Sequence, residues 1–381
     1  MKSIKIRLEF NNEQSKLASK HAGVSRHAYN WGLATCQEAY KNNEKRPSSI
    51  DLHKKLVKEV KSVNKWYYDV SKCAPQEALR NLDGAYKKAF KEKKGLPVFK
   101  KKGIKDSFYL EGNIRTEKNK IRLPIFGWVK MSETLAVASD LEDIKNVAIS
   151  KTAGQWFVAF KVPYAIYPKQ IKNNPVGVDL GIKALATLSE GTIFENKRPY
   201  KKAKRKLKIA QRKLSKKYKK GVPQSKNYKK EQQKVAKIHY KIACIRKDSL
   251  HKLTTYLAKN HSEVVIEDLN VSGMSKNHKL ASAILDGGFY EFRQQLTYKC
   301  EWYGSLLTVV DRFYPSSKTC SSCGIKKMTL KLSERTFNCE SCGFSCHRDL
   351  NASLNLKRKA VSYTVSACGV LRKPKASVPL A

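Results

Sequence analysis

Two pairs of cysteines near the C-terminal end constrain this chain more than any other feature of its sequence. The pairs are spaced C-x2-C-x15-C-x2-C and consist of Cys320, Cys323, Cys339 and Cys342. Four thiolates at this spacing can surround one zinc ion, and a glycine, Gly324 or Gly343, follows each pair where the chain must turn tightly. The pattern predicts a zinc ribbon whose single zinc ion is structural, because the protein fills all four coordination positions. Cys346 and His347 lie close by as replacement ligands, although neither belongs to a C-x2-C pair.

The charge balance of the chain indicates a polyanionic partner. Its 381 residues include 77 Lys and Arg against 32 Asp and Glu, which gives a formal net charge of +45. Such an excess repels itself in the folded protein, and nucleic acid is the polyanion that best compensates it. A generally basic surface, as in ribosome-associated proteins, is the alternative. A membrane-surface role is disfavoured because the sequence has no lipidation motif.

The composition also excludes several classes of protein. Hydrophobic residues make up 41% of the chain, which argues against disorder and suffices for two or three modules with real cores. No segment reaches the ~20 consecutive apolar residues that cross a bilayer, and the N-terminal segment lacks the apolar run of a signal peptide. The other six cysteines are scattered. We therefore expect a reducing compartment, a prokaryotic cytoplasm in which the protein associates with the nucleoid.

Strand and helix patterns alternate along the first half of the chain. Residues 2–10 alternate apolar and polar side chains, as a half-buried strand does. Helical spacing follows over residues 12–94, and strand patterns return over 98–165 in the segments KIRLP, GWVKM, NVAISK and QWFVAFKV. An isolated N-terminal strand needs partners. We expect it to join the later strands in a barrel-like sheet, with the helices as an insertion.

Two parts of the chain are candidates for contact with nucleic acid. Trp128, Trp156 and Phe157, with the basic run 99–102, offer aromatic and cationic groups, unless these aromatics are ordinary core residues. Residues 201–250 contain twenty Lys or Arg and only two acids, while their apolar residues keep helical spacing on both sides of a Gly-Val-Pro break. This pattern predicts a helical hairpin with one packed face. Its charged face lacks compensating glutamates at i±4, which favours phosphate contact over a merely solvated surface.

Three acidic residues stand in elements that are far apart in the sequence. Asp179 lies in the strand segment GVDLG, Glu267 ends the apolar strand VVIE, and Asp349 begins a helix directly after the cysteines. Such elements can converge at the end of one sheet. Two Mg²⁺ ions about 4 Å apart activate water and stabilise the leaving oxygen in phosphodiester cleavage, and a few carboxylates suffice to hold them. Because like charges raise one another's pKa, a metal-free cluster would be costly, and the pattern predicts a metal-dependent nuclease.

Each acid also has a plainer interpretation. Asp179 could be a turn residue before Gly181. Glu267 could be a strand end that faces solvent, and its neighbour Asp268 competes for the same role. Asp349 could be a helix N-cap.

Four motifs follow one another along the chain: GVDLGIKALATLS, VVIEDLN, YPSSKTCSSCG and FNCESCGFSCHRDLNASLN. Their order resembles that of the TnpB (OrfB) family of transposon-encoded proteins, which are relatives of type V CRISPR effectors. The resemblance covers essentially the whole chain and is most specific over residues 176–356. Softer motifs in the first half are QEALRNLDGAYKKAF and PVFKKKGIKDSF. Departures from the family pattern are few: Cys346 and His347 fill a variable stretch, and Ser353 stands where alanine is common.

The resemblance implies an α+β multidomain protein. Its expected parts are an N-terminal oligonucleotide-binding-type β-barrel, wedge-like (residues 1–10 and 96–170), a helical recognition insertion (11–95), a RuvC-like α/β nuclease domain of the RNase H fold (171–315 and 347–360), an inserted four-cysteine zinc ribbon (316–346) and a flexible tail (361–381).

The resemblance also implies roles for residues and partners. Asp179, Glu267 (in preference to Asp268) and Asp349 would be the catalytic acids that hold two Mg²⁺ ions, and the four cysteines would hold one zinc ion. Guide RNA and double-stranded target DNA would be the partners of a protein monomer, and the activity would be RNA-guided DNA cleavage beside a short flanking motif. A nuclease-independent zinc-ribbon DNA-binding regulator and a compact type V CRISPR effector are the alternatives.

Overall fold

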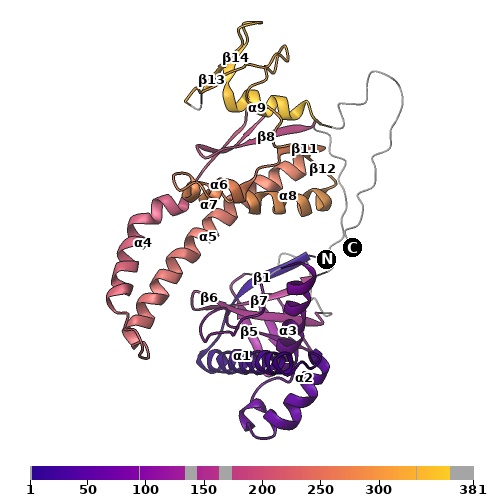
Figure 1. Ribbon diagram of the computed structural model, residues 1–381, viewed down its shortest axis with the longest axis vertical. Coiled ribbons are helices and arrows are strands. Elements are labelled where there is room, and N and C mark those ends of the chain that lie inside the picture. The colour runs from indigo at the N-terminus through magenta and orange to yellow at the C-terminus, as the bar shows by residue number, and fades with distance from the viewer. Residues whose placement is uncertain (1, 94, 134–143, 163–173, 332, 361–381) are drawn as a thin grey trace, which may run out of the picture. The chain divides into compact units, whose positions relative to one another are not determined.

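The chain has an α+β fold that divides into two compact units, Met1–Tyr164 and Ala165–Ala381, each built on its own sheet (Figure 1). The computed structural model describes residues 2–93, 95–133, 144–162, 174–331 and 333–360. The predicted tail, residues 361–381, lies outside the described residues. Within the part of the chain that the structure describes, no helix is both long and apolar enough to cross a membrane.

A seven-stranded sheet with the order β2-β6-β7-β1-β5-β4-β3 forms the centre of the first unit. Its strands are β1 (Lys2–Glu9), β2 (Ser107–Glu111), β3 (Arg115–Glu117), β4 (Lys120–Leu123), β5 (Gly127–Met131), β6 (Asn146–Thr152) and β7 (Gln155–Val162). β1 pairs antiparallel with both β5 and β7, so the prediction that the N-terminal strand joins later strands is confirmed. Ile6 and Leu8 enter a core with Val129 and Val158. Closure of this sheet into a barrel stays a prediction.

The helices of the first unit lie between β1 and β2 in the chain. They are α1 (Asn12–Lys41), α2 (Ser49–Lys55), the π-helical turn η1 (Leu56–Lys61), the 3-10 turn η2 (Lys65–Tyr67) and α3 (Cys73–Lys91). A capping box starts α1, since the Asn11 side chain accepts from Gln14 N and the Gln14 side chain accepts from Asn11 N. Gly32 lets α1 approach α3 closely, because a Cβ there would lie 2.7 Å from Leu79 Cδ2.

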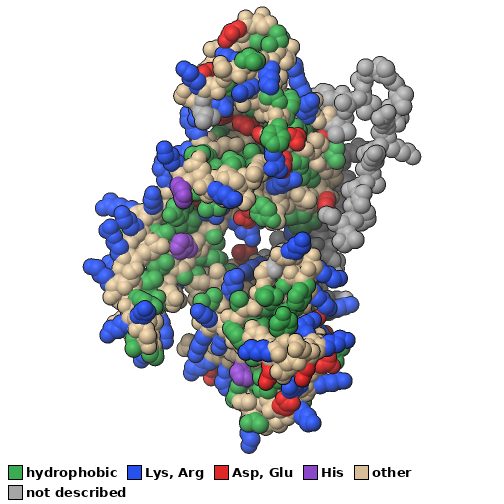
Figure 2. Space-filling model, viewed as in Figure 1, with side chains coloured by type: hydrophobic (Ala, Val, Ile, Leu, Met, Phe, Trp, Pro, Cys, Tyr) green, Lys and Arg blue, Asp and Glu red, His purple; other side chains and the backbone are tan. Residues whose placement is uncertain are grey.

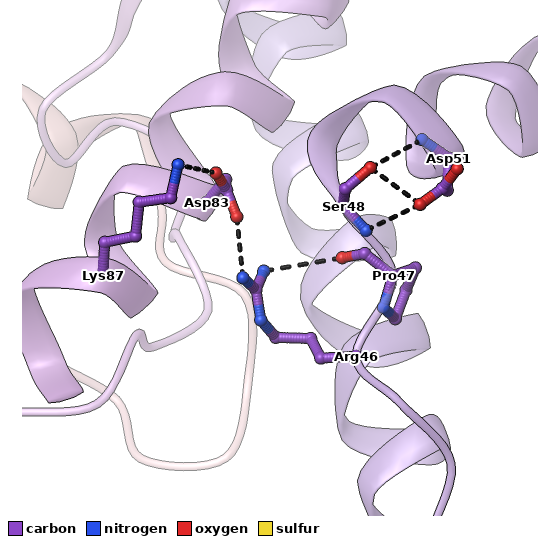
Figure 3. A network of polar contacts seen from close by, with 6 residues as sticks. All are labelled: Arg46, Pro47, Ser48, Asp51, Asp83 and Lys87. Carbon is purple, nitrogen blue, oxygen red and sulfur yellow. Dashed lines mark hydrogen bonds and ion pairs between the residues drawn. The ribbon is translucent and has the colours of Figure 1, made fainter.

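Ionic contacts hold the connection between α1 and α2 against α3 (Figure 3). Arg46 Nη2 lies 2.8 Å from Asp83 Oδ1, and Lys87 Nζ lies 2.9 Å from Asp83 Oδ2. Although burial opposes the effect, hydrogen bonds from Lys87 and Arg46 lower the pKa of Asp83. Ser48 and Asp51 form the capping box of α2. The loop is therefore fixed by ion pairs with α3 and by the capping box of α2.

A five-stranded sheet with the order β10-β9-β8-β11-β12 forms the centre of the second unit. Its strands are β8 (Val176–Leu180), β9 (Ala184–Leu188), β10 (Ile193–Glu195), β11 (Glu263–Glu267) and β12 (Leu306–Val310). β8, β9 and β10 form an antiparallel meander, whereas β8, β11 and β12 run parallel. The carboxyl ends of β8 and β11 therefore meet at one edge of the sheet.

Helices surround this sheet and continue beyond it. They are α4 (Pro199–Lys216), α5 (Lys226–Asn260), α6 (Val271–Ser275), α7 (Ala281–Gly287), α8 (Phe289–Tyr303) and α9 (Arg348–Lys357). Leu250, Leu253, Phe292 and Leu296 of α5 and α8 pack into the core beside Val264 and Ile266 of β11. The short strands β13 (Thr336–Asn338) and β14 (Ser345–His347) pair within the cysteine-rich segment that precedes α9.

Candidate metal-dependent active site

Two of the three predicted acids lie on neighbouring parallel strands. Val178 of β8 is the register partner of Ile266 on β11, so Asp179 and Glu267 occupy the next position along each strand. Side chains at matching positions of adjacent strands project from the same face of a sheet. The sheet therefore brings together two residues that are far apart in the sequence.

The third acid reaches this edge on α9, which packs directly on β8. A Cβ at Gly177 would lie 1.9 Å from the backbone oxygen of Ser353 and 2.5 Å from the backbone nitrogen of Lys357. Only glycine permits so close an approach of helix and strand. Asp349 lies in the first turn of the same helix, and its side chain is 21% exposed.

Electrostatics connects the three carboxylates. The pKa of Asp179 is raised to about 8, mainly by burial and then by the negative charges of Asp349 and Glu267. The positive charge of Arg348 opposes this shift. Burial and the charge of Asp268 raise the pKa of Glu267. Among the described residues, the side chains of Asp179 and Glu267 have no hydrogen-bond or ion-pair partner. Such uncompensated oxygens suit a hard divalent cation.

The adjacent acids Glu267 and Asp268 have opposite environments. The Asp268 carboxylate accepts hydrogen bonds from Arg312 and Arg293, which lower its pKa. Its charge is therefore compensated by two guanidinium groups, whereas Glu267 has no cationic partner in the described residues. This difference supports Glu267 over Asp268 as the candidate metal ligand, a choice that the sequence pattern alone left open.

His347, rather than Asp349, is the N-cap of α9. The imidazole Nδ1 of His347 accepts from the backbone N–H of Asp349 at 3.3 Å and lies 4.0 Å from Asp349 Oδ2. The N-cap interpretation of Asp349 is wrong, because the cap residue lies two positions before it. A hollow of about 430 Å³ opens beside the site and is lined by residues including Glu267, Tyr290, Arg293 and Arg312.

The four cysteines form a second cluster, and their geometry fits zinc. All four Sγ atoms lie within 4.8 Å of one another. The Sγ atoms of Cys320 and Cys342 are 3.7 Å apart and those of Cys323 and Cys339 are 3.6 Å apart. A tetrahedral site with Zn–S bonds of about 2.3 Å requires sulfur separations of about 3.8 Å. No other group of acids, histidines and cysteines in the described residues is gathered so tightly, and the three carboxylates are more widely spaced.

Backbone groups prepare this cluster for a metal. N–H groups of Cys342 and Ser341 donate to the Cys339 sulfur and lower the pKa of that thiol. A backbone hydrogen bond from Ile325 acts in the same direction on Cys323, but burial and the three neighbouring thiols outweigh it and raise the pKa of Cys323. Zinc binds the thiolate, so a lowered pKa favours binding at neutral pH.

Two asparagines of α9, which the sequence patterns did not single out, attach the cysteine segment to this helix. Asn351 Nδ2 donates to Thr319 O at 2.7 Å and its Oδ1 accepts from Ser321 N at 2.9 Å. Asn355 Nδ2 donates to Ser316 O at 2.8 Å and to Thr319 O at 2.6 Å. Both asparagines are fully buried. Their i, i+4 spacing in NASLN was the available signal, because it places both amides on one helix face. One helix thus carries Asp349 and anchors the cysteine cluster.

Three family models match separate parts of the chain. Residues 144–278 match the OrfB_IS605 family, described as a probable transposase, and residues 289–356 match the Cas12f1-like TNB domain. Residues 1–45 match a family described as a helix-turn-helix domain, although α1 forms one uninterrupted helix from Asn12 to Lys41 in this structure.

Two curated proteins match almost the whole chain. The "Putative RNA-guided DNA endonuclease InsQ" of Escherichia coli (strain K12) is 33% identical over 97% of this chain and 94% of its own length. The chain belongs to the TnpB (OrfB) family. A "Putative RNA-guided DNA endonuclease" of Streptomyces pristinaespiralis is 34% identical over 97% of this TnpB-family chain and 91% of its own length.

A solved structure shares the fold of this TnpB-family chain at low sequence identity. The cryo-EM structure of a Cas12f1–sgRNA–target DNA complex matches with a TM-score of 0.56 and 15% identity, covering 92% of this chain and 83% of that one. The likeness supports a common α+β fold.

Basic side chains gather on the helical hairpin of this TnpB-family chain. α4 and α5 lie side by side beyond the sheet (Figure 1), and Lys and Arg side chains cover much of their visible surface (Figure 2). A hollow of about 660 Å³ between them is lined by residues including Lys202, Arg205, Lys213, Lys234 and Lys237. The predicted helical hairpin is confirmed, with α4 and α5 as its two helices.

The predicted aromatic surface of the first unit is mostly core. Trp156 and Phe157 are buried, and Trp128 is 44% exposed. In the basic run 99–102, the Lys100 ammonium lies 3.9 Å from the centroid of the Tyr29 ring. The core interpretation of Trp156 and Phe157 is confirmed.

Proposed function

We propose that this chain is an RNA-guided, Mg²⁺-dependent DNA endonuclease encoded by a transposable element. The observation that carries the proposal is the convergence of three acids: Asp179 and Glu267 follow register partners on neighbouring parallel strands, and Asp349 lies in the first turn of the helix that packs on β8. A chain of net charge +45 has little reason to gather three acids except to bind cations. Full-length relatives that bear the name RNA-guided DNA endonuclease supply independent support.

In this proposal, Asp179, Glu267 and Asp349 hold two Mg²⁺ ions. Bound Mg²⁺ supplies an activated water and stabilises the leaving oxygen of the scissile phosphate. Arg293 and Arg312 line the neighbouring hollow and keep unused N–H donors for a phosphate oxygen of the strand. Asp268 positions these two guanidinium groups. Hydrolysis by water requires no covalent intermediate on the protein.

The remaining parts receive roles from the family. We infer a RuvC-like nuclease domain of the RNase H fold (171–315 and 347–360) interrupted by the zinc ribbon (316–346), in which the four cysteines hold one structural zinc ion. We assign residues 1–10 and 96–170 to the oligonucleotide-binding-type barrel and residues 11–95 to the helical recognition insertion. Guide RNA and double-stranded DNA bind to these parts and to the basic hairpin, and the chain acts as a monomer with its RNA on DNA of the nucleoid.

The decisive experiment is cleavage by the protein together with the RNA that co-purifies with it. That RNA is sequenced, a plasmid library with a matching target and randomised flanks is added, and cut products are read with Mg²⁺ or with EDTA. We expect cuts only with Mg²⁺ and only beside one flanking motif. Asp179→Asn should abolish them and leave DNA binding intact. Glu195→Gln, which changes an exposed acid on the edge strand β10, should cut normally.

A zinc-ribbon DNA-binding regulator predicts a different result. It would bind the same DNA and yield no cuts with any flank, and Asp179→Asn would change nothing. A compact type V CRISPR effector would cut in the same way, and a repeat array beside its gene, rather than transposon ends, would distinguish it.

A further inference from the structure

A third hollow lies within the first unit. It measures about 650 Å³ and opens along one side of α1, where Gly23, His27 and Trp31 line it. Trp66 of η2 lines it from the segment before α3. Nothing proposed above for the acids or the cysteines uses these residues. Hollows of this size accommodate small ligands or single nucleotides.

The Trp66 ring is both exposed and rigidly held. It is 41% exposed, yet its Nε1 donates to Asn64 Oδ1 at 3.1 Å. The ring centroid lies 4.5 Å from that of the buried Tyr67 and 5.1 Å from that of His27, which meets it edge-on at 86°. An exposed aromatic ring that is fixed in this way loses little conformational entropy when another flat ring stacks on it.

Polar groups that can form further hydrogen bonds lie beside the Trp66 ring. Lys20 Nζ contacts Asp69 Oδ2 at 2.9 Å and Arg26 Nη1 contacts Asp106 Oδ1 at 3.2 Å. Each cation keeps further N–H donors after its ion pair, and the Asp69 carboxylate keeps acceptor sites. His27 Nδ1 lies 2.8 Å from Tyr67 Oη. Mixed donors and acceptors beside a stacking ring match the edge of a nucleobase, which itself presents both.

We propose that this pocket receives one unpaired nucleotide of the bound nucleic acid, with its base stacked on Trp66 and its edge facing Lys20 and Arg26. The net charge of +45 makes a nucleic acid the ligand that this chain attracts most strongly. A base inside a duplex cannot enter, because both of its faces are stacked. The inference rests on the proposed nucleic-acid-binding function and adds a site to it. Guide RNA and displaced DNA offer the same chemistry.

Photocrosslinking tests the proposal in the full chain carrying Asp179→Asn, so that the result does not depend on cleavage. The probes are short single strands of RNA or DNA with one 5-iodouridine, and the same strands paired to a complement, at raised salt to weaken general phosphate contacts. We expect mass spectrometry to place the main crosslink on Trp66, His27 or Trp31 for single strands only. The strand type that crosslinks better identifies the source of the nucleotide.

Two variants with matched controls complete the test. Trp66→Leu removes the stacking ring, and Tyr40→Leu removes another exposed aromatic ring of the same unit that does not line the hollow. Gly23→Leu fills the hollow from a helix position whose nearest neighbour to a Cβ is Arg26 Nη2 at 3.9 Å, and Gly84→Leu makes the same change where nothing lies within 4 Å. The first member of each pair should weaken single-strand binding about fivefold to a hundredfold, and the second should not.

Crosslinks that map elsewhere, or binding that survives both Trp66→Leu and Gly23→Leu, would overturn the proposal. Equal crosslinking of paired and unpaired probes would overturn it too. These outcomes are separate from those of the cleavage assay. A chain that cuts DNA but gives no crosslink in this pocket refutes the pocket alone, and a chain that crosslinks there but never cuts refutes the nuclease alone.

Discussion

The cysteine cluster and the three carboxylates of the second unit are assembled in opposite ways. The cysteines come from one short stretch, Cys320 to Cys342, and their sulfurs lie within 4.8 Å of one another. The carboxylates come from β8, β11 and α9 and meet only because the sheet and helix pack. The cysteine cluster depends on one segment of the chain, whereas the proximity of the carboxylates depends on the packing of the whole unit.

The two clusters also relate differently to stability. Thiols that bind zinc contribute the binding free energy to the folding of their segment. Carboxylates gathered without a cation oppose folding, as the raised pKa of Asp179 indicates. Removing a cysteine should therefore destabilise the zinc-bound protein. Removing one of the three acids should stabilise the metal-free protein. The predictions below test this contrast, from the largest expected effect to the smallest.

The largest effect is expected from Cys320→Ser. Losing one thiolate of a four-sulfur site should lower the zinc content from about one ion per chain to well below one and unfold the segment. Zinc is measured by mass spectrometry of the purified metalloprotein, and local unfolding by hydrogen exchange. Cys346→Ser is the matched control, since Cys346 lies outside the cluster and should leave zinc in place. Loss of zinc in the control with retention in Cys320→Ser would reassign the ligands.

Glu267→Gln and its neighbour Asp268→Asn should separate a metal ligand from a positioning residue. We expect at least about a thousandfold loss of cleavage rate for Glu267→Gln, because the metal supplies several kcal/mol of transition-state stabilisation. Asp268→Asn should cost less than about tenfold, since it removes ion pairs whose arginines remain. It should also shift the pKa of Glu267 back toward its ordinary value, because the charge of Asp268 contributes to raising it. Equal losses in single-turnover rate would contradict the assignment.

Gly177→Ala should break the carboxylate cluster without touching a ligand. The added Cβ meets backbone atoms of Ser353 and Lys357, so α9 must move away from β8. We expect a loss of roughly 3 kcal/mol in the free energy of unfolding, at the upper end of ordinary overpacking, together with strongly reduced cleavage. Zinc content should stay unchanged, because the cysteines move with their own segment. Gly84→Ala, placed in open space on α3, serves as the control in thermal unfolding.

The smallest effect concerns pH and needs no mutation. Burial and the neighbouring acids raise the pKa of Asp179 to about 8 from an ordinary value of 3.8. Between these values the folded state holds a proton that the unfolded state has released. The metal-free protein should therefore lose stability as pH rises from about 4 to about 8. Asp179→Asn should flatten this slope. Added Mg²⁺ should raise the unfolding temperature more at pH 8 than at pH 6, because protons compete with the cation.

Local patterns predicted much of the fold. The alternating segments around residues 120, 128, 147 and 158 are all strands, because period-two burial is visible in the sequence. β2 and β3 were missed. β3 consists of Arg115, Thr116 and Glu117, which carry no apolar pattern, so only pairing with β4 makes them a strand. The 3-10 turn that contains Trp66 was not predicted either.

The sequence by itself determined the cysteine cluster, the basic hairpin and the three candidate acids, because spacing, charge and strand ends are local properties of the chain. Only the tertiary structure decided that Glu267 rather than Asp268 lacks a cationic partner, that His347 caps α9, and that Trp66 lines a pocket with Trp31. Each of these depends on side chains that are distant in sequence. Their burial and pairing are set by how the sheets and helices pack, and no single segment specifies that packing.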